Sequence, residues 1–370
     1  MRSKFEKKYL PWFTLREILG FGHRNFSRLI QGFETPDAIL AAPKKELKAM
    51  GWIPDQVISN ICNPDDFQKS AEKEIRDTLD NGIKILTLDH PNYPNLLKQI
   101  NDPPPILTYL GTIEGTAPCI AMVGSRNATG YGLNSARNLS KNLAIHGLTI
   151  VSGMARGIDS AAHEGTLGVK GKTIAVLGSG LKRIYPKENK DLFYEIPKKG
   201  AVVSEFKLDT KPFPYNFPAR NRIIAGMSCG TVIVEAARKS GSLITARLSA
   251  EYNREIFAVP GSIKSTKSQG THALLKQGAK LVETETDILE ELGQFLHSEK
   301  SVSQSKPPCP ALDTSSRTLM DLMDPYPKHV DLIIEASQMG SAKVNAILLE
   351  LELQGLINRH PGNYFSTSEE

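Results

Sequence analysis

One segment of this 370-residue chain, residues 213–224, combines aromatic rings, prolines and guanidinium groups just ahead of a predicted helix. Phe217 precedes Arg220, Asn221 and Arg222 within it. A site for single-stranded nucleic acid needs cations for the phosphates and exposed aromatic faces for the bases. Two arginines at a helix start are unfavourable unless an anion binds there. The segment therefore predicts a site for a single-stranded polyanion, and burial of some of its rings and prolines under a sheet is the alternative.

Three predicted strand ends carry glycine or serine ahead of a helix, an arrangement that turns backbone amides and a helix N-terminus toward an anion. The first turn contains Gly124, Ser125 and Arg126, the second contains Gly153, and the third contains Lys239, Ser240 and Gly241. A forked guanidinium such as that of Arg126 suits phosphate. The turns predict phosphate binding, and a plain strand-to-helix turn with an arginine packed on its surface is the alternative.

Acid–base catalysis has less support in the sequence. Asp159 is expected to cap the helix after the second turn. Glu235 either acts as a catalytic carboxylate or braces Arg220 or Arg222, and bracing is the favoured interpretation. His163 offers a general base, but no nucleophile or paired carboxylate accompanies it in sequence. We therefore predict a binding site and no enzyme.

Cofactor and metal motifs are absent from the sequence. No GxGxxG pattern follows the first strand of the predicted sheet, and no Walker P-loop occurs anywhere. The four cysteines form no CxxC pair, and the eight histidines add no metal-ligand spacing. We predict no nucleotide cofactor, no metal, and free thiols in a reducing cytoplasm.

Charge is distributed unevenly around the formal net charge of +5. Residues 120–296 contain 24 Lys and Arg against 15 Asp and Glu, whereas residues 313–370 contain four against nine. A basic middle region fits a polyanionic partner, and the acidic last region argues against that partner contacting it. No apolar stretch is long enough for a membrane span, and the N-terminus lacks a signal-peptide pattern. The sequence predicts a cytoplasmic protein without membrane contact.

Six apolar runs of strand length recur from residue 120 onward, with helical segments between them. They lie at 120–124, 148–152, 173–178, 201–204, 231–235 and 255–259. Continuous apolar runs predict strands buried on both faces, and therefore a parallel sheet flanked by helices. The predicted fold is α/β, a doubly wound, mostly parallel Rossmann-like sheet whose ligands bind at the carboxyl ends of the strands.

Four regions are predicted along the chain. Residues 1–65 consist of short helices with glycine turns that resemble a helix-hairpin-helix or SAM-like module, and residues 66–297 form an extended Rossmann-like domain with a strand at 83–88 and a proline-rich connection. Residues 298–312 are a linker rich in Ser, Lys and Pro. Two helices and a hairpin in residues 313–370 outline a winged helix. Its second helix, with one lysine and two glutamates, favours protein contact over insertion into a DNA groove.

An ordered set of motifs makes residues 85–295 resemble the DNA-processing A (DprA/Smf) family. The motifs are Tyr93-Pro94, Val123 to Arg126, Ser152 to Asp159, Ile184 to Asn189, Ser204-Glu205, Phe217 to Ile224, Glu235-Ala236 with Ser240 to Ser242, and Val259 to Gly261. One such block is weak, but the set in this order is highly specific. The three-part build of the family, SAM-like, Rossmann-like and winged helix, agrees with the regions predicted above.

The resemblance implies a non-catalytic protein that protects incoming single-stranded DNA during natural transformation and loads RecA recombinase onto it. It also implies a homodimer through the Rossmann-like domain, with single-strand-binding protein as a further candidate partner. Lys211 is the lysine closest to a basic position that some relatives have, where this chain has Pro214 nearby. The expected DNA-binding residues are Gly124, Ser125, Arg126, Gly153, Lys211, Phe217, Arg220, Asn221, Arg222, Lys239, Ser240 and Gly241.

Two other functions stay open at this point. Gly230-Thr231 with Glu235 resembles the Lonely Guy group of nucleotide-cleaving phosphoribohydrolases, which share a Rossmann-like core. Those enzymes have Pro-Gly-Gly ahead of Gly-Thr, where this chain has Met227-Ser228-Cys229. The second alternative is a regulator that binds duplex DNA through its winged helix, which the acidic charge of that region disfavours.

Overall fold

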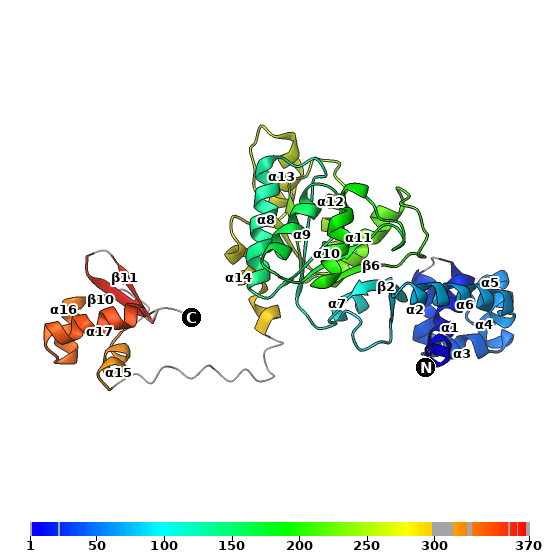
Figure 1. Cartoon of the computed structure of the whole chain (residues 1–370), viewed down its shortest axis with the longest axis horizontal. Helices are drawn as coiled ribbons and strands as arrows, with labels where there is room; N and C mark the ends of the chain where they lie inside the picture. The colour runs from blue at the N-terminus through cyan, green and yellow to red at the C-terminus, as the bar shows by residue number, and fades with distance from the viewer. Residues whose placement is uncertain are drawn as a thin grey trace. The chain divides into compact units, whose positions relative to one another are not determined.

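The computed structural model describes residues 2–20, 23–297, 314–323, 328–353, 356–360 and 362–367. The chain divides into two compact units, Met1–Glu299 and Lys300–Glu370 (Figure 1). The first unit contains an N-terminal group of helices and a large α/β sheet, and it carries all of the predicted DNA-binding residues.

A nine-stranded sheet lies at the centre of the first unit, as far as the described residues extend. Its strand order is β1-β2-β6-β5-β4-β3-β7-β8-β9. The strands are β1 (Lys84–Thr87), β2 (Ile106–Gly111), β3 (Cys119–Gly124), β4 (Thr149–Ser152), β5 (Thr173–Val176), β6 (Ala201–Ser204), β7 (Gly230–Val234), β8 (Glu255–Ala258) and β9 (Lys280–Leu281).

The strands from β3 to β9 pair in parallel, which confirms the predicted doubly wound, mostly parallel fold. All six predicted strands are present. The proline-rich connection differs from the prediction, because residues 106–111 form β2, which pairs antiparallel with both β6 and β1. The strand starts directly after the last of three prolines at 103–105, so the prolines end before any ladder hydrogen bond is needed.

Helices cover both faces of the sheet because side chains alternate along each strand. Ile120 and Met122 of β3 pack in one core cluster with residues of α8, α9 and α14, whereas Ala121 and Val123 face the cluster that includes α11 and α12. The helices of this domain are α7 (Asn95–Lys98), α8 (Gly130–Ile145), α9 (Ile158–Gly168), α10 (Lys190–Glu195), α11 (Asn216–Met227), α12 (Ser242–Glu251), α13 (Gln269–Lys276) and α14 (Glu285–His297).

The N-terminal helices share one hydrophobic core with the sheet domain. They are α1 (Arg2–Leu19), α2 (His23–Phe33), α3 (Pro36–Ala41), α4 (Lys44–Ala49), α5 (Asp55–Cys62) and α6 (Asp65–Asp80). The predicted boundary after residue 65 falls at the start of α6, but α6 packs against α1 and therefore belongs with these helices. Their likeness to a SAM-like module stays a prediction.

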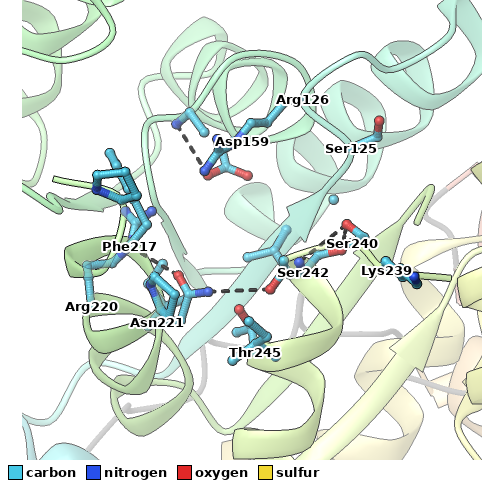
Figure 2. Close-up of a pocket in the computed structure, with 18 of the residues that line it drawn as sticks. Ser125, Arg126, Asp159, Phe217, Arg220, Asn221, Lys239, Ser240, Ser242 and Thr245 are labelled. Atoms are coloured by element: carbon cyan, nitrogen blue, oxygen red, sulfur yellow. Dashed lines mark hydrogen bonds between the residues drawn. The ribbon is translucent and has the colours of Figure 1, made fainter. Parts of the chain in front are cut away.

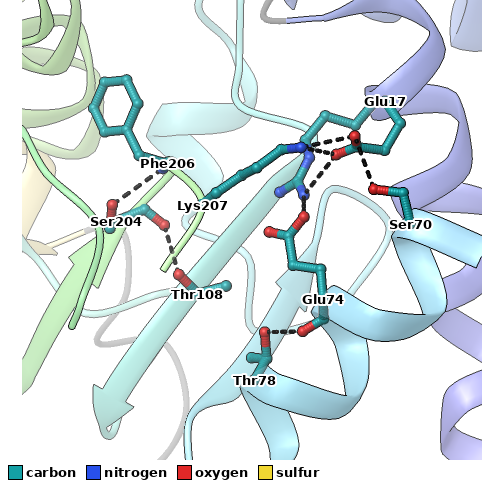
Figure 3. A network of polar contacts seen from close by, with 9 residues as sticks. Glu17, Ser70, Glu74, Thr78, Thr108, Ser204, Phe206 and Lys207 are labelled. Carbon is teal, nitrogen blue, oxygen red and sulfur yellow. Dashed lines mark hydrogen bonds and ion pairs between the residues drawn. The ribbon is translucent and has the colours of Figure 1, made fainter. Parts of the chain in front are cut away.

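A polar network joins the N-terminal helices to the sheet domain (Figure 3). Lys207 Nζ, just after β6, lies 2.7 Å from a carboxylate oxygen of Glu17 on α1. Arg16, which is 4% exposed, pairs with Glu74 on α6. Each of these cations pairs with a carboxylate of the same unit. The ion pairs connect the N-terminal helices to one another and to the sheet domain.

The second unit has its own small hydrophobic core. Its helices are α15 (Thr314–Asp321), α16 (Val330–Ser337) and α17 (Ser341–Leu353), and its sheet contains β10 (Lys328–His329), β11 (Ile357–His360) and β12 (Tyr364–Thr367) in the order β10-β12-β11. Two helices followed by an antiparallel hairpin are the predicted winged-helix outline. The linker predicted at 298–312 lies outside the described residues.

The described helices contain no segment that is both long enough and apolar enough to cross a membrane. Within the same residues, no group of three or more His, Cys, Asp or Glu side chains is placed to hold a metal ion.

Candidate nucleic-acid interface

A pocket of about 690 Å³ opens at the carboxyl ends of β3 and β7 (Figure 2). These strands are neighbours, and the winding of the sheet reverses between them, which is where ligands bind in open α/β sheets. The walls come from the loops after β3, β4, β5, β6 and β7 and from the first turns of α11. The predicted residues that line it are Gly124, Ser125, Arg126, Phe217, Arg220, Asn221, Lys239, Ser240 and Gly241.

The turn after β3 is held against two neighbouring loops. A Cβ atom on Gly124 would lie 1.9 Å from the carbonyl oxygen of Val234, so only glycine lets β3 end this close to β7. The carbonyl of Ser125 accepts a hydrogen bond from Ile158 N at the start of α9. These contacts fix the backbone, while the side chain of Arg126 stays exposed at the mouth of the pocket.

Phe217 forms the aromatic part of the wall. A Cβ atom on Gly178 would lie 2.8 Å from its ring, so the ring is seated on a glycine. The guanidinium carbon of Arg126 lies 5.4 Å from the centre of this ring, within cation–π range. Tyr185, which is 43% exposed, lies 5.6 Å away between ring centres. Sequence reasoning did not select Tyr185, although it belongs to one of the quoted motifs.

Arg220 forms the floor of the pocket and is 3% exposed. Its Nη1 donates hydrogen bonds to the carbonyls of Gly153, at 2.8 Å, and Val176, and its Nε donates to Asn221 Oδ1. Burial lowers the pKa of Arg220 to about 10, against the opposing effect of Asp159, so the guanidinium stays charged at neutral pH. Because protein carbonyls hold it, Arg220 offers a positive field more than a free phosphate ligand.

Gly153 acts on the pocket through Arg220 and is not part of the wall. A Cβ atom at this position would lie 2.3 Å from Arg220 Nη1. The glycine therefore makes room for the guanidinium, and its carbonyl accepts one of the hydrogen bonds that hold it.

Asp159 organises the loop after β4, and its predicted role as a helix cap is wrong. The N-cap of α9 is Gly157, and the carboxylate of Asp159 in the first turn accepts hydrogen bonds from the backbone N–H groups of Gly153 and Ala155 at 3.1 and 3.3 Å. Burial raises the pKa of Asp159, while Arg220 and these two backbone donors oppose the shift. Asp159 is thus a buried neighbour of Arg220 that shapes the loop.

Glu235 braces the turn after β3, and the prediction that it braces an arginine is wrong. Its carboxylate accepts hydrogen bonds from Thr129 N, at 2.9 Å, and from Thr129 Oγ1, at the N-terminus of α8. The positive end of α8, which the first turn was predicted to offer to an anion, is therefore occupied by a carboxylate of the protein. Glu235 does not line the pocket, so it is not placed for the hydrolytic role.

The turn after β7 brings the start of α12 to the pocket. Ser240, Gly241 and Ser242 line the wall where α12 starts, and the hydroxyls of the two serines lie 2.7 Å apart. Asn221 Nδ2 donates to the carbonyl of Gly241 at 3.4 Å, which links α11 to this turn. Backbone amides at such a helix start suit phosphate.

Arg222 lies outside the pocket, contrary to the prediction. It is 6% exposed, pairs with Glu205, and donates to the carbonyl of Asp102 at 2.7 Å. The reason is helical geometry, because residues two apart on a helix point to opposite sides. With Arg220 turned to the pocket, Arg222 is turned toward Asp102 and Glu205, and it lines a smaller hollow with Tyr252.

Lys211 lies beside the pocket and does not line it. Its side chain is exposed, and its carbonyl accepts a hydrogen bond from Asn216 Nδ2 at 3.3 Å. The next residues, Pro212 and Pro214, form the neighbouring wall.

The rim of the pocket is electropositive. Arg126 and Lys239 are both exposed, and within the described part of the chain neither has an acidic side chain as an ion-pair partner. Arg220 adds a third positive charge from below. The site therefore combines two accessible cations, an amide-rich turn and an aromatic ring around one cavity.

Known proteins are similar to this chain in both sequence and fold. The profile of the family described as DNA recombination-mediator protein A matches residues 84–293, and that of the DprA winged helix domain matches residues 303–363. Protein Smf from Synechocystis sp. is 35% identical over 389 residues, covering 95% of this chain and 96% of the relative.

Two solved structures are similar as well. DNA processing protein A from Streptococcus pneumoniae superposes with a TM-score of 0.64 at 34% identity, covering 75% of this chain and 96% of that one. DNA processing protein A from Helicobacter pylori, solved to explain its single-stranded DNA binding mode, gives a TM-score of 0.52 at 31% identity, covering 58% and 96%. The family profile spans more than half of the chain and includes every strand and turn of the pocket. This chain belongs to the DprA/Smf family.

Proposed function

We propose that this protein binds single-stranded DNA in the pocket at the carboxyl ends of β3 and β7. The observation that carries the proposal is the joint placement of two exposed cations, Arg126 and Lys239, and the ring of Phe217 at one cavity, with Arg126 over the ring. Cations and aromatic faces in one groove are the two requirements of a single-strand site. The similar protein from Helicobacter pylori, which binds single-stranded DNA, supports it.

In this mechanism the backbone of the strand is captured first. Arg126 and Lys239 neutralise phosphates, and the backbone N–H of Gly241 at the start of α12 donates a hydrogen bond to a further phosphate oxygen. Phe217 stacks against a base, with Arg126 over its ring and Tyr185 beside it. Because phosphate contacts carry no sequence information, binding should be tolerant of sequence and should weaken steeply with salt.

The wider role proposed here rests on family membership. We propose that the protein protects incoming single-stranded DNA and loads RecA recombinase onto it during natural transformation, without catalysing a reaction of its own. The proposal includes a homodimer formed through the Rossmann-like domain. A strand-exchange assay with RecA and a sedimentation measurement test the loading and the dimer, respectively.

The binding site is tested by titrating labelled single-stranded and duplex oligonucleotides at several salt concentrations. We expect a clear preference for the single strand. The Arg126→Ala/Lys239→Ala double variant should bind about tenfold more weakly, and its slope of log affinity against log salt should be shallower by about 1.4, since each lost phosphate contact on a single strand removes about 0.7.

The matched control removes the same charge elsewhere. Lys141 on α8 and Lys276 on α13 are exposed and do not line the pocket. The Lys141→Ala/Lys276→Ala variant should keep the wild-type salt slope. Equal slopes for the two double variants would contradict the pocket assignment, and release of free base from nucleoside monophosphates would favour the hydrolase alternative.

A further inference from the structure

Two aromatic rings form an exposed stack beside the pocket. Phe213 and Tyr215 have ring centres 5.5 Å apart and planes inclined by only 7°. Phe213 is 42% exposed and Tyr215 is 70% exposed. The pocket described above does not include either ring, because Pro212 and Pro214 between and before them form the wall instead.

The segment that carries the stack is held in one conformation. Asn216, which is 3% exposed, donates from Nδ2 to the carbonyl of Lys211, and its backbone N–H donates to the carbonyl of Phe213 at 3.0 Å. This second bond closes a turn around Pro214 and Tyr215, and each proline fixes its own φ angle. The rings therefore lie on a loop that is already ordered. Binding of a ligand to them costs little conformational entropy of the loop.

The chemistry around the stack fits a nucleobase better than a protein surface. The exposed large apolar side chains at this edge of the pocket, Tyr185, Phe213 and Tyr215, are all flat rings. Lys211 at the base of the loop is exposed, and no acidic side chain pairs with it within the described residues. Aromatic faces interleaved with a cation bind the bases and phosphates of single strands.

We propose that the outer face of Tyr215 stacks a second nucleobase of a strand that leaves the pocket over the wall of Pro212 and Pro214. Phe213 supports the Tyr215 ring from behind, and Lys211 contacts the adjoining phosphate. The inference rests on the proposed function, since it extends the same DNA path beyond Phe217. It assigns Phe213 and Tyr215 as binding residues and gives Lys211 a place outside the pocket.

Oligothymidylates of two lengths test the path. The two lengths are about 4 and about 16 nucleotides, the ends of the range of known single-strand site sizes, so the longer strand has far more chain to extend past the wall of Pro212 and Pro214. Tyr215→Ala should weaken binding of the longer strand by about 5- to 150-fold, the range expected for one lost base–aromatic stack, and should weaken binding of the shorter strand less. Tyr215→Phe keeps the ring and should bind as the wild type does.

The matched control is Tyr194→Ala. Tyr194 on α10 is 54% exposed and does not line the pocket, so its loss removes a comparable surface ring. Both tyrosines are exposed and each contacts one neighbouring ring, so the two alanine variants should lose a similar and small amount of stability. Equal affinities of the Tyr215→Ala and Tyr194→Ala variants for the longer strand would overturn the proposal.

A spectroscopic probe reports stacking directly. In a Tyr215→Trp variant, the emission of the new indole should be quenched when the longer strand is added, and a strand with the same phosphates but abasic sites should not quench it. Absence of quenching in a variant that still binds DNA would refute only the stacking of a second nucleobase at position 215. Absence of any single-strand binding by the wild type would instead refute the proposed function.

Discussion

The pocket has an exposed rim, and a buried layer of polar side chains lies beneath it and behind α11. Both groups contain charged side chains, which serve different purposes. We define the rim as Arg126, Lys239, Ser240 and Gly241, and the buried layer as Asp159, His163, Glu205, Arg220 and Arg222. The rim cations are exposed, with no acidic partner within the described residues. The arginines of the layer are 3% and 6% exposed and are held by carbonyls or carboxylates of the protein.

The contrast between exposed and buried arginines shows that residue type alone does not determine whether a cation binds DNA or stabilises the fold. A buried charge is strongly unfavourable unless protein groups pair with it, so the arginines of the layer are already satisfied. A cation in water can exchange its counterions for a phosphate, so the rim is where affinity and salt dependence arise. The buried layer should therefore control stability, and the rim should control binding.

The largest effect expected of the buried layer comes from Arg222→Ala. The change leaves the carboxylate of Glu205, which is 1% exposed, without its guanidinium partner, and breaking a buried pair destabilises a protein by about 3–5 kcal/mol. Urea unfolding, followed by the fluorescence of Trp12 and Trp52, measures the loss. Both tryptophans pack in the core of the first unit.

The DNA binding of the Arg222→Ala variant should be measured at a urea concentration below its unfolding transition, where the protein is still folded. Its salt slope should equal that of the wild type, in contrast to the Arg126→Ala/Lys239→Ala variant. A shallower slope for Arg222→Ala would mean that this arginine contacts phosphate after all, and the division into rim and layer would fail.

Much of the fold followed from sequence patterns, because buried parallel strands are continuous apolar runs. The six runs from residue 120 onward became β3 to β8, and the turns at Gly124 and Gly241 lie where the carboxyl ends of β3 and β7 meet. The strand β2 was missed, since the prolines before Ile106 favoured an irregular connection.

The roles of the charged residues were harder to predict, since they depend on which loops meet in space. Glu235 follows β7 but bonds to Thr129 after β3, a contact across 106 positions of sequence. Arg220 and Arg222 have the same side chain. Their positions on opposite sides of α11 place Arg220 at the pocket and Arg222 in the interior of the first unit. This difference was readable from the helical spacing of the two positions, which is the signal the prediction did not use.

Lowering the pH should decrease the free energy of unfolding through the buried side chain of His163. This decrease should be smaller than the loss expected for Arg222→Ala. Burial, with a further contribution from Arg220, lowers the pKa of His163 to about 3, against an ordinary value of 6.5. Below pH 6.5 the unfolded chain takes up a proton that the folded protein does not, so stability falls as the pH falls. The loss from this group is about 1 kcal/mol between neutral pH and about pH 5.5.

A His163→Gln variant isolates this contribution. An amide at this position keeps a partner for Thr173 Oγ1, which lies 2.7 Å from His163 Nδ1 in the wild type. The difference between the unfolding free energies at neutral pH and at about pH 5.5 should shrink by about 1 kcal/mol in the variant. An unchanged difference would show that His163 is accessible to protons and that the layer is less closed than its burial indicates.

The smallest effect is expected from removing residues 300–370, the second unit of the chain. Residues 313–370 carry four basic and nine acidic residues, so their removal takes away net negative charge and no part of the pocket. Because all residues that line the pocket belong to the first unit, single-strand affinity should rise by no more than about twofold at a salt concentration that screens the removed charge. Titration of the truncated and full-length proteins under identical salt measures the change. A loss of tenfold or more would place part of the DNA site in the winged helix, and the rim alone would no longer account for binding.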